Sequence, residues 1–286
     1  MRFLIRLVYL PLFLIVGNGV AVSLVLNGQS ELWLVALAIG FIGIAFLFER
    51  WAPYDPDFNK ARGDANRDLM HGLVNESLNV VGVMSIPLLA SLNPVPSTWP
   101  TLWPLWAQLL LAILIADIGI TLAHFASHRF DPLWRLHAVH HSVKRMYGFN
   151  GLMKHPLHQS IETIAGTTPL LLMGAPVDVM MLLVVAVVLQ LLLQHSNVDY
   201  FTGPLKYLLA INVVHRFHHL NNAKEGDVNF GLFTQLTDRL LGTAYYDSTR
   251  RIASEDLGID GVPDYPIGYG PQLIEPFRRR PRTQLA

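Results

Sequence analysis

The sequence predicts an all-α integral membrane protein, a helical bundle of about four spanning helices plus one apolar hairpin, with a histidine-rich cap on its cytoplasmic side. Two observations support this fold class. Hydrophobic residues make up 52% of the 286 residues and charged residues only 15%, a balance typical of chains that contact lipid. Long uncharged stretches also alternate with shorter polar segments that carry the basic residues and most of the histidines.

The first two apolar stretches, residues 3–26 and 32–48, are long enough to cross a hydrocarbon core as helices, which takes about 20 residues. A cleaved signal peptide is the alternative for the first stretch, because Arg2 and Arg6 resemble its positive leading region. No small-residue cleavage site precedes Asn27, however, so we expect a retained helix. A short turn-like link then makes the two stretches a helical hairpin.

Further apolar segments follow a polar stretch. Residues 78–93 and 102–123 form a second pair of expected helices. Residues 163–194 are interrupted by the turn-forming sequence MGAPVD and either span as a hairpin or dip into the membrane and return. Residues 201–214 are too short to cross and are expected at the interface or over a functional site.

The chain contains no internal repeat apart from a recurring HxxHH, and no linker long enough to separate domains. We therefore expect one membrane-embedded catalytic domain over residues 1–248, with its motif-bearing core at about 67–243. Residues 249–286 form a polar tail rich in Pro and Gly. Its basic run at 278–282 is expected to contact anionic headgroups or to be mobile.

The positions of the basic residues predict the orientation. No Lys or Arg occurs within 7–49, 68–128 or 155–205, and basic residues concentrate on the cytoplasmic side of membrane proteins. We therefore expect a protein of the bacterial inner membrane with its N-terminus and histidine motifs in the cytoplasm. The cytoplasmic basic residues include Arg129, Arg135, Lys144, Arg145 and Lys154. The equal totals of 21 basic and 21 acidic residues give no reason to expect a nucleic-acid partner.

Histidines dominate the candidate functional residues. The stretch HFASHRFDPLWRLHAVHH at 124–141 directly follows an apolar segment, and HRFHH at 215–219 repeats its HxxHH pattern. Histidines three or four residues apart on a helix share a face and can converge on one ion. Adjacent histidines diverge by about 100°, which suits two neighbouring ions. The chain has no cysteine, so any metal must be held by nitrogen and oxygen ligands.

A single histidine on an apolar face is more often a hydrogen-bonded core residue than a ligand. Eight histidines in one HxxxH and two HxxHH patterns favour metal, because burying so many unpaired imidazoles would cost about 1–3 kcal/mol each. Outside these patterns, His71 is expected to be structural and His155 to be a ligand, while His158 is undecided. Imidazole alone does not distinguish iron from zinc, copper or nickel.

The pattern of HxxxH, HxxHH, a lone downstream His and a final HxxHH resembles the membrane fatty acid hydroxylase and sterol desaturase superfamily. The resemblance covers roughly residues 67–243 and includes HP at His155, QHSN at 194–197, DVNFG at 227–231 and DRLLGT at 238–243. It implies as metal ligands His124, His128, His137, His140, His141, His195, His215, His218 and His219, with His155 as a tenth. Four further residues are assigned to hydrogen bonding of the ligand imidazoles: Asp117, Asn197, Asp227 and Asn229.

The chain departs from the family pattern at three positions. His158 stands where many relatives have Glu, Thr237 where a Trp often occurs, and Asp199 where some relatives have another ligand histidine. The coordination around His195 and the role of His158 are the features that these departures affect.

The resemblance implies a di-iron oxidoreductase that uses O2 to hydroxylate a C–H bond of a fatty acyl, sterol or related lipid. No flavin, haem or nicotinamide motif is evident, so electrons are expected from an external electron-transfer protein that docks near residues 129–154. A lipid desaturase with the same centre is the nearest alternative. A zinc-dependent membrane hydrolase, or a protein that only binds or transports metal, is a more distant one.

Overall fold

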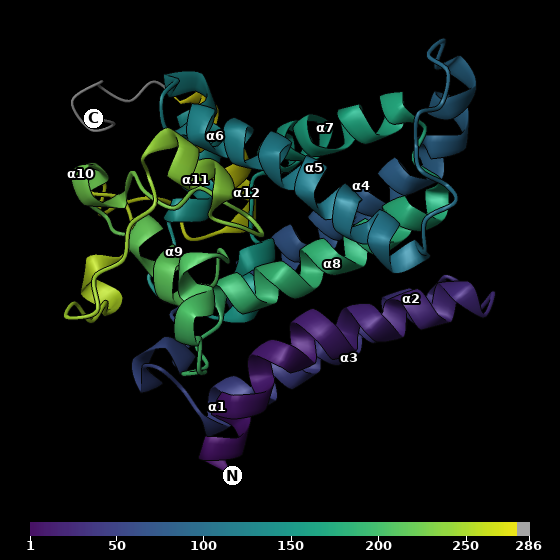
Figure 1. Cartoon of the computed structure of the whole chain (residues 1–286). Coiled ribbons are helices and arrows are strands. Elements are labelled where there is room, and N and C mark those ends of the chain that lie inside the picture. Colours follow the sequence, from purple (N-terminus) through teal and green to yellow (C-terminus); the bar gives the residue numbers. More distant parts are fainter. Residues whose placement is uncertain (279–286) are drawn as a thin grey trace.

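The structure, a computed structural model, describes residues 1–278, and within this range it is helical with isolated β-bridges but no β-strand (Figure 1). Five of its helical segments are long and apolar enough to cross a membrane. These are the helix formed by α1 (Arg2–Pro11) and α2 (Asn18–Leu26), followed by α3 (Leu32–Trp51), α4 (Ala65–Leu92), α5 (Leu105–Ser127) and α8 (Val177–His195). The remaining helices are α6 (Asp131–His141), α7 (Pro156–Met173), α9 (Asn212–His218), α10 (Ala223–Gly226), α11 (Leu236–Leu241) and α12 (Tyr269–Ile274).

Helices α1 and α2 are continuous through a π-helical turn at Leu12–Gly17, which follows Pro11. A π-turn replaces the usual four-residue hydrogen bonds of a helix with five-residue ones, which changes the partners of its backbone carbonyls. The side chain of Asn18 donates to two of them, the carbonyl oxygens of Leu14 at 3.0 Å and Phe13 at 3.3 Å. The segment therefore remains one long helix, as expected for the first apolar stretch.

Helix α8 lies at the centre of the bundle. Nearly all its residues are apolar, and most of them, from Val179 to His195, are buried on every side, as expected of a helix without a polar face. It packs against α2, α3, α4 and α5 and ends at His195. The central helix therefore carries one of the candidate ligands on its last turn.

Helices α5 and α7 pack closely because glycines lie at their contact. A Cβ atom on Gly119 of α5 would lie 2.2 Å from the carbonyl oxygen of Ala165, and one on Gly166 of α7 would lie 2.8 Å from Ile120. Small residues let helix backbones approach in this way. Helix α7 ends at Met173 and is capped by Gly174, whose φ of 78° lies in the left-handed region and turns the chain toward α8.

The long helices run in alternating directions between the two ends of the bundle. Helices α3, α5 and α8 end, and α4 and α7 begin, at the end of the bundle where α6, α9, α10, α11 and α12 gather as a cap (Figure 1). The opposite end holds the links between α2 and α3 and between α4 and α5. Thr98 in the second link hydrogen-bonds Met173, at the far end of α7. Residues 163–194 therefore belong to an antiparallel α7–α8 hairpin, of which α8 is a candidate span.

Helix α4 begins at Ala65, earlier than the apolar stretch at 78–93 indicates. Its first turns are polar but buried under the cap. His71 Nε2 lies 3.0 Å from Gln272 Oε1, and Asn75 donates to the carbonyl oxygens of Leu152 and Lys154. Hydropathy alone misses these turns because their polar groups are satisfied by distant segments.

The segment after residue 248 begins with packed residues: Ile252 and Leu257 are buried beside Phe217, and α12 contacts α4. The boundary between the catalytic domain and the tail, at residue 248, stays a prediction. Of the expected headgroup-binding run, residues 279–282 lie outside the described part of the chain.

Candidate metal centre

Nine histidines of the cap and adjoining helix ends converge in two buried clusters. The first cluster consists of His124, His128, His137, His141 and His218. The second consists of His140, His195, His215 and His219. Within each, one nitrogen or oxygen atom per residue lies within 4.8 Å of all the others, so each cluster could hold a metal ion.

Secondary structure accounts for this division. His140 and His141 are adjacent on α6 and point to different clusters, and His218 and His219 do the same at the end of α9. This is the divergence expected of neighbouring helical residues. His195, at the end of α8, completes the second cluster. Each HxxHH motif thus contributes ligands to both clusters of one paired site.

In the first cluster, four Nε2 atoms form a closed ring of short distances. The distance from His124 to His137 is 2.9 Å and that from His137 to His141 is 3.0 Å. The distance from His141 to His218 is 3.0 Å and that from His218 back to His124 is 2.9 Å. Ligands about 2.1 Å from a metal lie about 3.0 Å apart at right angles and about 3.4 Å apart at the tetrahedral angle. The four separations are therefore short enough for these histidines to bind one ion together.

The second cluster has similar spacing. His215 Nε2 lies 3.1 Å from His195 Nε2 and 3.1 Å from His219 Nε2. The ring of His140 lies 4.8 Å from that of His195 and 4.7 Å from that of His219, centre to centre. All four histidines are buried.

The rings are oriented by hydrogen bonds at their other nitrogen, Nδ1. In the first cluster, Nδ1 of His124 donates to the carbonyl oxygen of Phe230 at 2.8 Å and that of His218 to Val228 at 2.9 Å. Because neutral imidazole carries one proton, Nε2 of both rings then presents a lone pair. The two Nε2 atoms lie 2.9 Å apart, so their lone pairs face each other.

Two facing lone pairs at this distance repel each other unless a cation lies between them. Protonation of one ring is disfavoured, because burial lowers the pKa of His218 well below its ordinary value. Burial does the same to the pKa of His141 in the same cluster. The donor set therefore fits a divalent metal ion that accepts neutral imidazole nitrogen.

The orienting hydrogen bonds come mainly from one loop, residues 227–234. Asp227 accepts from His128 Nδ1 at 2.9 Å and pairs with Arg129. The same loop supplies the carbonyl groups that bind His124 and His218. The DVNFG motif thus positions three ligands of the first cluster.

Three acidic or amide side chains hold this loop in place. Asp117 accepts from the backbone N–H groups of residues 232, 233 and 234. Asp238 of the DRLLGT motif accepts from the N–H groups of residues 230 and 231. Asn229, at φ 55°, donates to the carbonyl oxygens of Val214 and Tyr245.

These contacts correct three sequence assignments. Asp117 and Asn229 were expected to bind ligand imidazoles directly, but they bind the backbone of the loop and its surroundings. Asn197 instead holds the segment after α3, through Asp55 and Asn59. Only Asp227 of the four contacts a cluster histidine. An Asp in an apolar helix predicts a buried partner, and here that partner is backbone N–H.

Two partners of the second cluster were not predicted. His195 Nδ1 lies 3.0 Å from Asn150 Oδ1, and His140 Nδ1 lies 2.8 Å from the carbonyl oxygen of Met153. Both come from the loop after α6. No sequence motif distinguishes Asn150, so its role follows only from the placement of this loop against α8.

The remaining histidines have different environments. His155 lies outside both clusters: its Nδ1 accepts from Leu157 N–H at the start of α7. The expected tenth ligand is therefore a helix cap. His71 bonds Gln272, in line with a structural role. Asp199, which replaces a possible ligand histidine, pairs with Arg6 at 3.3 Å.

His158 stands beside the first cluster. Its ring centre lies 4.4 Å from that of His137, and the two form a small buried group with Glu162. Glu162 also pairs with Lys154 at 2.5 Å, and burial lowers the pKa of His158 to about 4. A lysine on the same carboxylate disfavours a third metal ion there. The group instead forms a polar wall behind His137.

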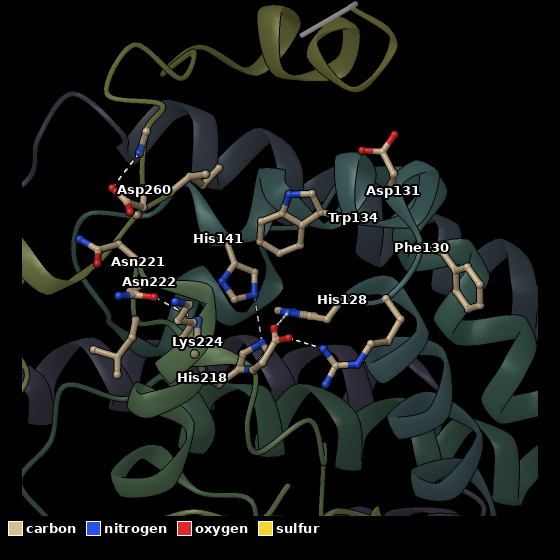
Figure 2. Close-up of a pocket in the computed structure, with 17 residues that line it drawn as sticks. His128, Phe130, Asp131, Trp134, His141, His218, Asn221, Asn222, Lys224 and Asp260 are labelled. Atoms are coloured by element: carbon tan, nitrogen blue, oxygen red, sulfur yellow. Dashed lines mark hydrogen bonds and ion pairs between the residues drawn. The ribbon is translucent and has the colours of Figure 1, made fainter. Parts of the chain in front are cut away.

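A cavity of about 570 Å³ opens onto the first cluster and is lined by His128, His141 and His218 (Figure 2). Its wall carries charges of both signs, including Asp131, Lys224 and Asp260, besides the indole of Trp134 and the ring of Phe130. The cluster is thus reached through a polar entrance with aromatic side walls.

The cap's basic residues are less available to a partner than the sequence suggests. Arg145 is buried and pairs with Asp64 at 2.8 Å, and Lys154 is buried against Glu162. These two therefore do not belong to a docking surface. Arg129 and Arg135 lie nearer the surface and pair with acidic neighbours.

Five membrane-length helices and two imidazole clusters define a class: integral membrane proteins with a paired histidine site. The fatty acid hydroxylase family profile matches residues 109–243, which contain every cluster histidine. The chain belongs to this family, as the resemblance in the sequence predicts.

Three relatives illustrate the similarity. The chain is 32% identical over 263 residues to the ornithine lipid hydroxylase OlsE of Rhizobium tropici, covering 89% of this chain and 78% of the relative. It is 29% identical to an alkylglycerol monooxygenase of Danio rerio, of which it covers 33%. It is 31% identical to the very-long-chain aldehyde decarbonylase GL1-1 of Oryza sativa subsp. indica, of which it covers 28%. No solved structure shows a significant match.

Proposed function

We propose that this protein is an O2-dependent di-iron oxidoreductase that hydroxylates a C–H bond of a membrane lipid. The observation that carries the proposal is the pair of buried imidazole clusters at the ends of membrane-length helices. Family membership and the hydroxylase and monooxygenase relatives support the reaction class. A desaturase would use the same residues and is separated from a hydroxylase by its product.

The first cluster would hold one iron ion and the second cluster the other. Bound iron would supply the reduction of O2 and the oxidation of the substrate C–H bond. The nine donors are all imidazole nitrogens, which iron accepts, and the reactions of the hydroxylase and monooxygenase relatives support iron as the metal. The reaction consumes two electrons and two protons for each O2, so an external electron donor is required.

The chain's own residues prepare the site for this chemistry. The carbonyl oxygens of Phe230, Val228 and Met153 fix the tautomer of three imidazoles, so that Nε2 of each is free to bind metal. Asp227 holds His128 in the same way and adds negative charge that offsets that of a bound cation.

The substrate is proposed to enter through the cavity in Figure 2. Charges of both signs on its wall, such as Asp131 and Lys224, suit a lipid with a charged polar head. An ornithine lipid, the substrate class named for the Rhizobium tropici relative, is the first candidate.

Metal analysis and product analysis test the proposal together. His141→Ala in the first cluster and His215→Ala in the second should each lower the iron content and abolish product formation, while the protein remains in the membrane. His155→Asn, which keeps a capping side chain on α7, should retain iron and activity.

The product distinguishes the alternatives. Lipids from membranes that contain the active protein should gain the mass of one oxygen atom, whereas a desaturase product would lose two hydrogen atoms. Full iron content and full activity in both cluster variants would refute the proposal. Tightly bound zinc with no oxidised lipid would favour the hydrolase alternative.

A further inference from the structure

A second cavity, of about 280 Å³, lies beside α9 and has no cluster histidine on its wall. It is bounded by Tyr54 after α3, by residues 198–200 after α8, by Arg216 of α9 and by residues 246–252. Arg216 lies within the HRFHH motif but lines this cavity, while His215 and His219 belong to the second cluster. The proposed oxidation chemistry gives this cavity no role.

Arg216 is a buried cation that forms no ion pair among the described residues, although Asp199 and Glu49 act on it at longer range. Only 3% of the residue is exposed, and among residues 1–278 no carboxylate forms an ion pair with it. Its guanidinium lies 3.7 Å from the ring centre of Tyr54 and donates to the carbonyl oxygen of Ser196 at 2.9 Å. Its Nε–H is buried and has no acceptor. Guanidinium stays charged in proteins, and a buried unpaired charge is costly.

A second arginine faces the same tyrosine. The guanidinium of Arg251 lies 4.7 Å from the ring centre of Tyr54 and donates to the Tyr54 carbonyl oxygen, but it has no ion pair among the described residues. Ile252 N–H and its carbonyl oxygen both bond the Tyr54 hydroxyl. The segment that carries Arg251 is therefore fixed against the cavity.

The acidic residues on the wall are already engaged. Asp199 pairs with Arg6 at 3.3 Å and Arg2 at 3.9 Å. Asp247 accepts from the backbone N–H and the hydroxyl of Thr249. Neither carboxylate forms an ion pair with Arg216. The cavity therefore combines the buried guanidinium of Arg216 and the exposed guanidinium of Arg251, both without ion pairs, with aromatic walls.

We propose that this cavity binds the phosphate group of a membrane lipid between Arg216 and Arg251. Planar guanidinium groups match phosphate oxygens in charge and geometry. The cavity also lies where headgroups are expected: Tyr54 follows the end of α3, and Asp199 on its wall pairs with Arg6 of α1. The bound phosphate neutralises Arg216 and ties residues 246–252 to α9.

Thermal unfolding of the purified full chain in a non-ionic detergent tests this site. Three probes are compared: dihexanoyl phosphatidic acid, inorganic phosphate and dihexanoylglycerol, which lacks phosphate. The phosphatidic acid should raise the midpoint temperature saturably, and the diglyceride should leave it unchanged. Stabilisation by inorganic phosphate at the same concentration would assign the site to soluble phosphate instead of lipid and overturn the lipid assignment.

Variants link the effect to the cavity. Arg216→Gln and Arg251→Gln should each weaken phosphatidic acid binding at least about tenfold, the effect of losing one charge-assisted hydrogen bond. Arg62→Gln, on an exposed loop outside both cavities, should bind like the parent chain. Arg216 is adjacent to the cluster residue His215, so loss of binding in Arg216→Gln alone could reflect misfolding. In that case the binding measured for Arg251→Gln decides whether the cavity is the site. Unchanged binding in Arg251→Gln, or no stabilisation by phosphatidic acid, overturns the proposal.

Discussion

Asp227, in the loop 227–234, accepts a hydrogen bond directly from the cluster residue His128. Replacing it as Asp227→Asn keeps an acceptor oxygen but removes the negative charge that holds the His128 proton and the Arg129 guanidinium. Loss of such a partner typically costs 10–100-fold in metal affinity. We expect a loss of about that size at the first cluster, measured as iron retained against increasing chelator.

A matched control lines the same cavity. Asp131→Asn removes a carboxylate that pairs with Arg135 at 2.9 Å and contacts no cluster histidine. It should retain iron like the parent protein. If both variants lose iron at the same chelator concentration, the effect comes from the charge of the cavity and not from the bond to His128.

At the residue scale, the sequence predicts which histidines form the clusters, but it does not predict which groups orient the histidine rings. Spacing on a helix fixes which histidines share a face, so the division of His140 from His141 follows locally. The orienting groups are backbone carbonyls, such as those of Phe230 and Met153, which any residue carries. Their roles depend on how loops distant in the sequence pack against the clusters, so the residue types at these positions do not reveal them.

At the scale of helices, the contact between α5 and α7 depends on Gly119. Gly119→Ala places a Cβ against the carbonyl oxygen of Ala165, where the ideal distance is 2.2 Å, so the helices must separate. We expect destabilisation of about 1–3 kcal/mol, the usual cost of overpacking. Thermal unfolding in detergent measures it.

Gly82→Ala is the control, because Gly82 lies on the candidate spanning helix α4 with no atom within 4 Å of its added Cβ. Alanine has the higher helix propensity, so the stability should stay equal or increase slightly. Equal destabilisation of both variants would mean that the close α5–α7 contact does not contribute to stability.

The helices themselves were largely predictable, since apolar length identifies α3, α5 and α8. The start of α4 was not, because its polar first turns are buried by α12 and by the loop before α7. Hydropathy identifies residues that face lipid or core. It does not identify a polar helical turn whose hydrogen bonds come from segments distant in sequence.

At the scale of the whole molecule, many buried imidazoles make stability depend on pH. Burial lowers the pKa of His137, His140, His215 and His219 well below 6.5. In the unfolded chain these groups take up protons as the pH falls through about 6.5, whereas in the folded metal-free chain they stay neutral. Folding stability is therefore present above this pH and declines as the pH falls below it.

Unfolding of chelator-treated protein from about pH 7.5 to 5 should show a midpoint temperature that falls on acidification. The double variant His141→Gln, His215→Gln should have a shallower dependence, because it removes two of the groups that take up protons on unfolding. A midpoint independent of pH over this range would contradict the depressed pKa values.

The arrangement of the helices also predicts which side of the membrane the cap faces. Arg2 and Arg6 pair with Asp199, Arg145 pairs with Asp64, and Arg216 donates to the carbonyl oxygen of Ser196, so these four basic residues lie at the capped end. The opposite links, at residues 27–31 and 93–104, contain no Lys or Arg. Because basic residues resist translocation, we expect the cap and the histidine clusters in the cytoplasm.

The absence of cysteine makes this orientation directly measurable. Gln29→Cys lies in the exposed link between α2 and α3, and Lys60→Cys lies in the exposed loop between α3 and α4 on the capped side. In intact spheroplasts a membrane-impermeant maleimide should label the first and not the second, whereas lysed membranes should label both. The reverse pattern would place the cap outside, where a cytoplasmic electron donor could not reach it.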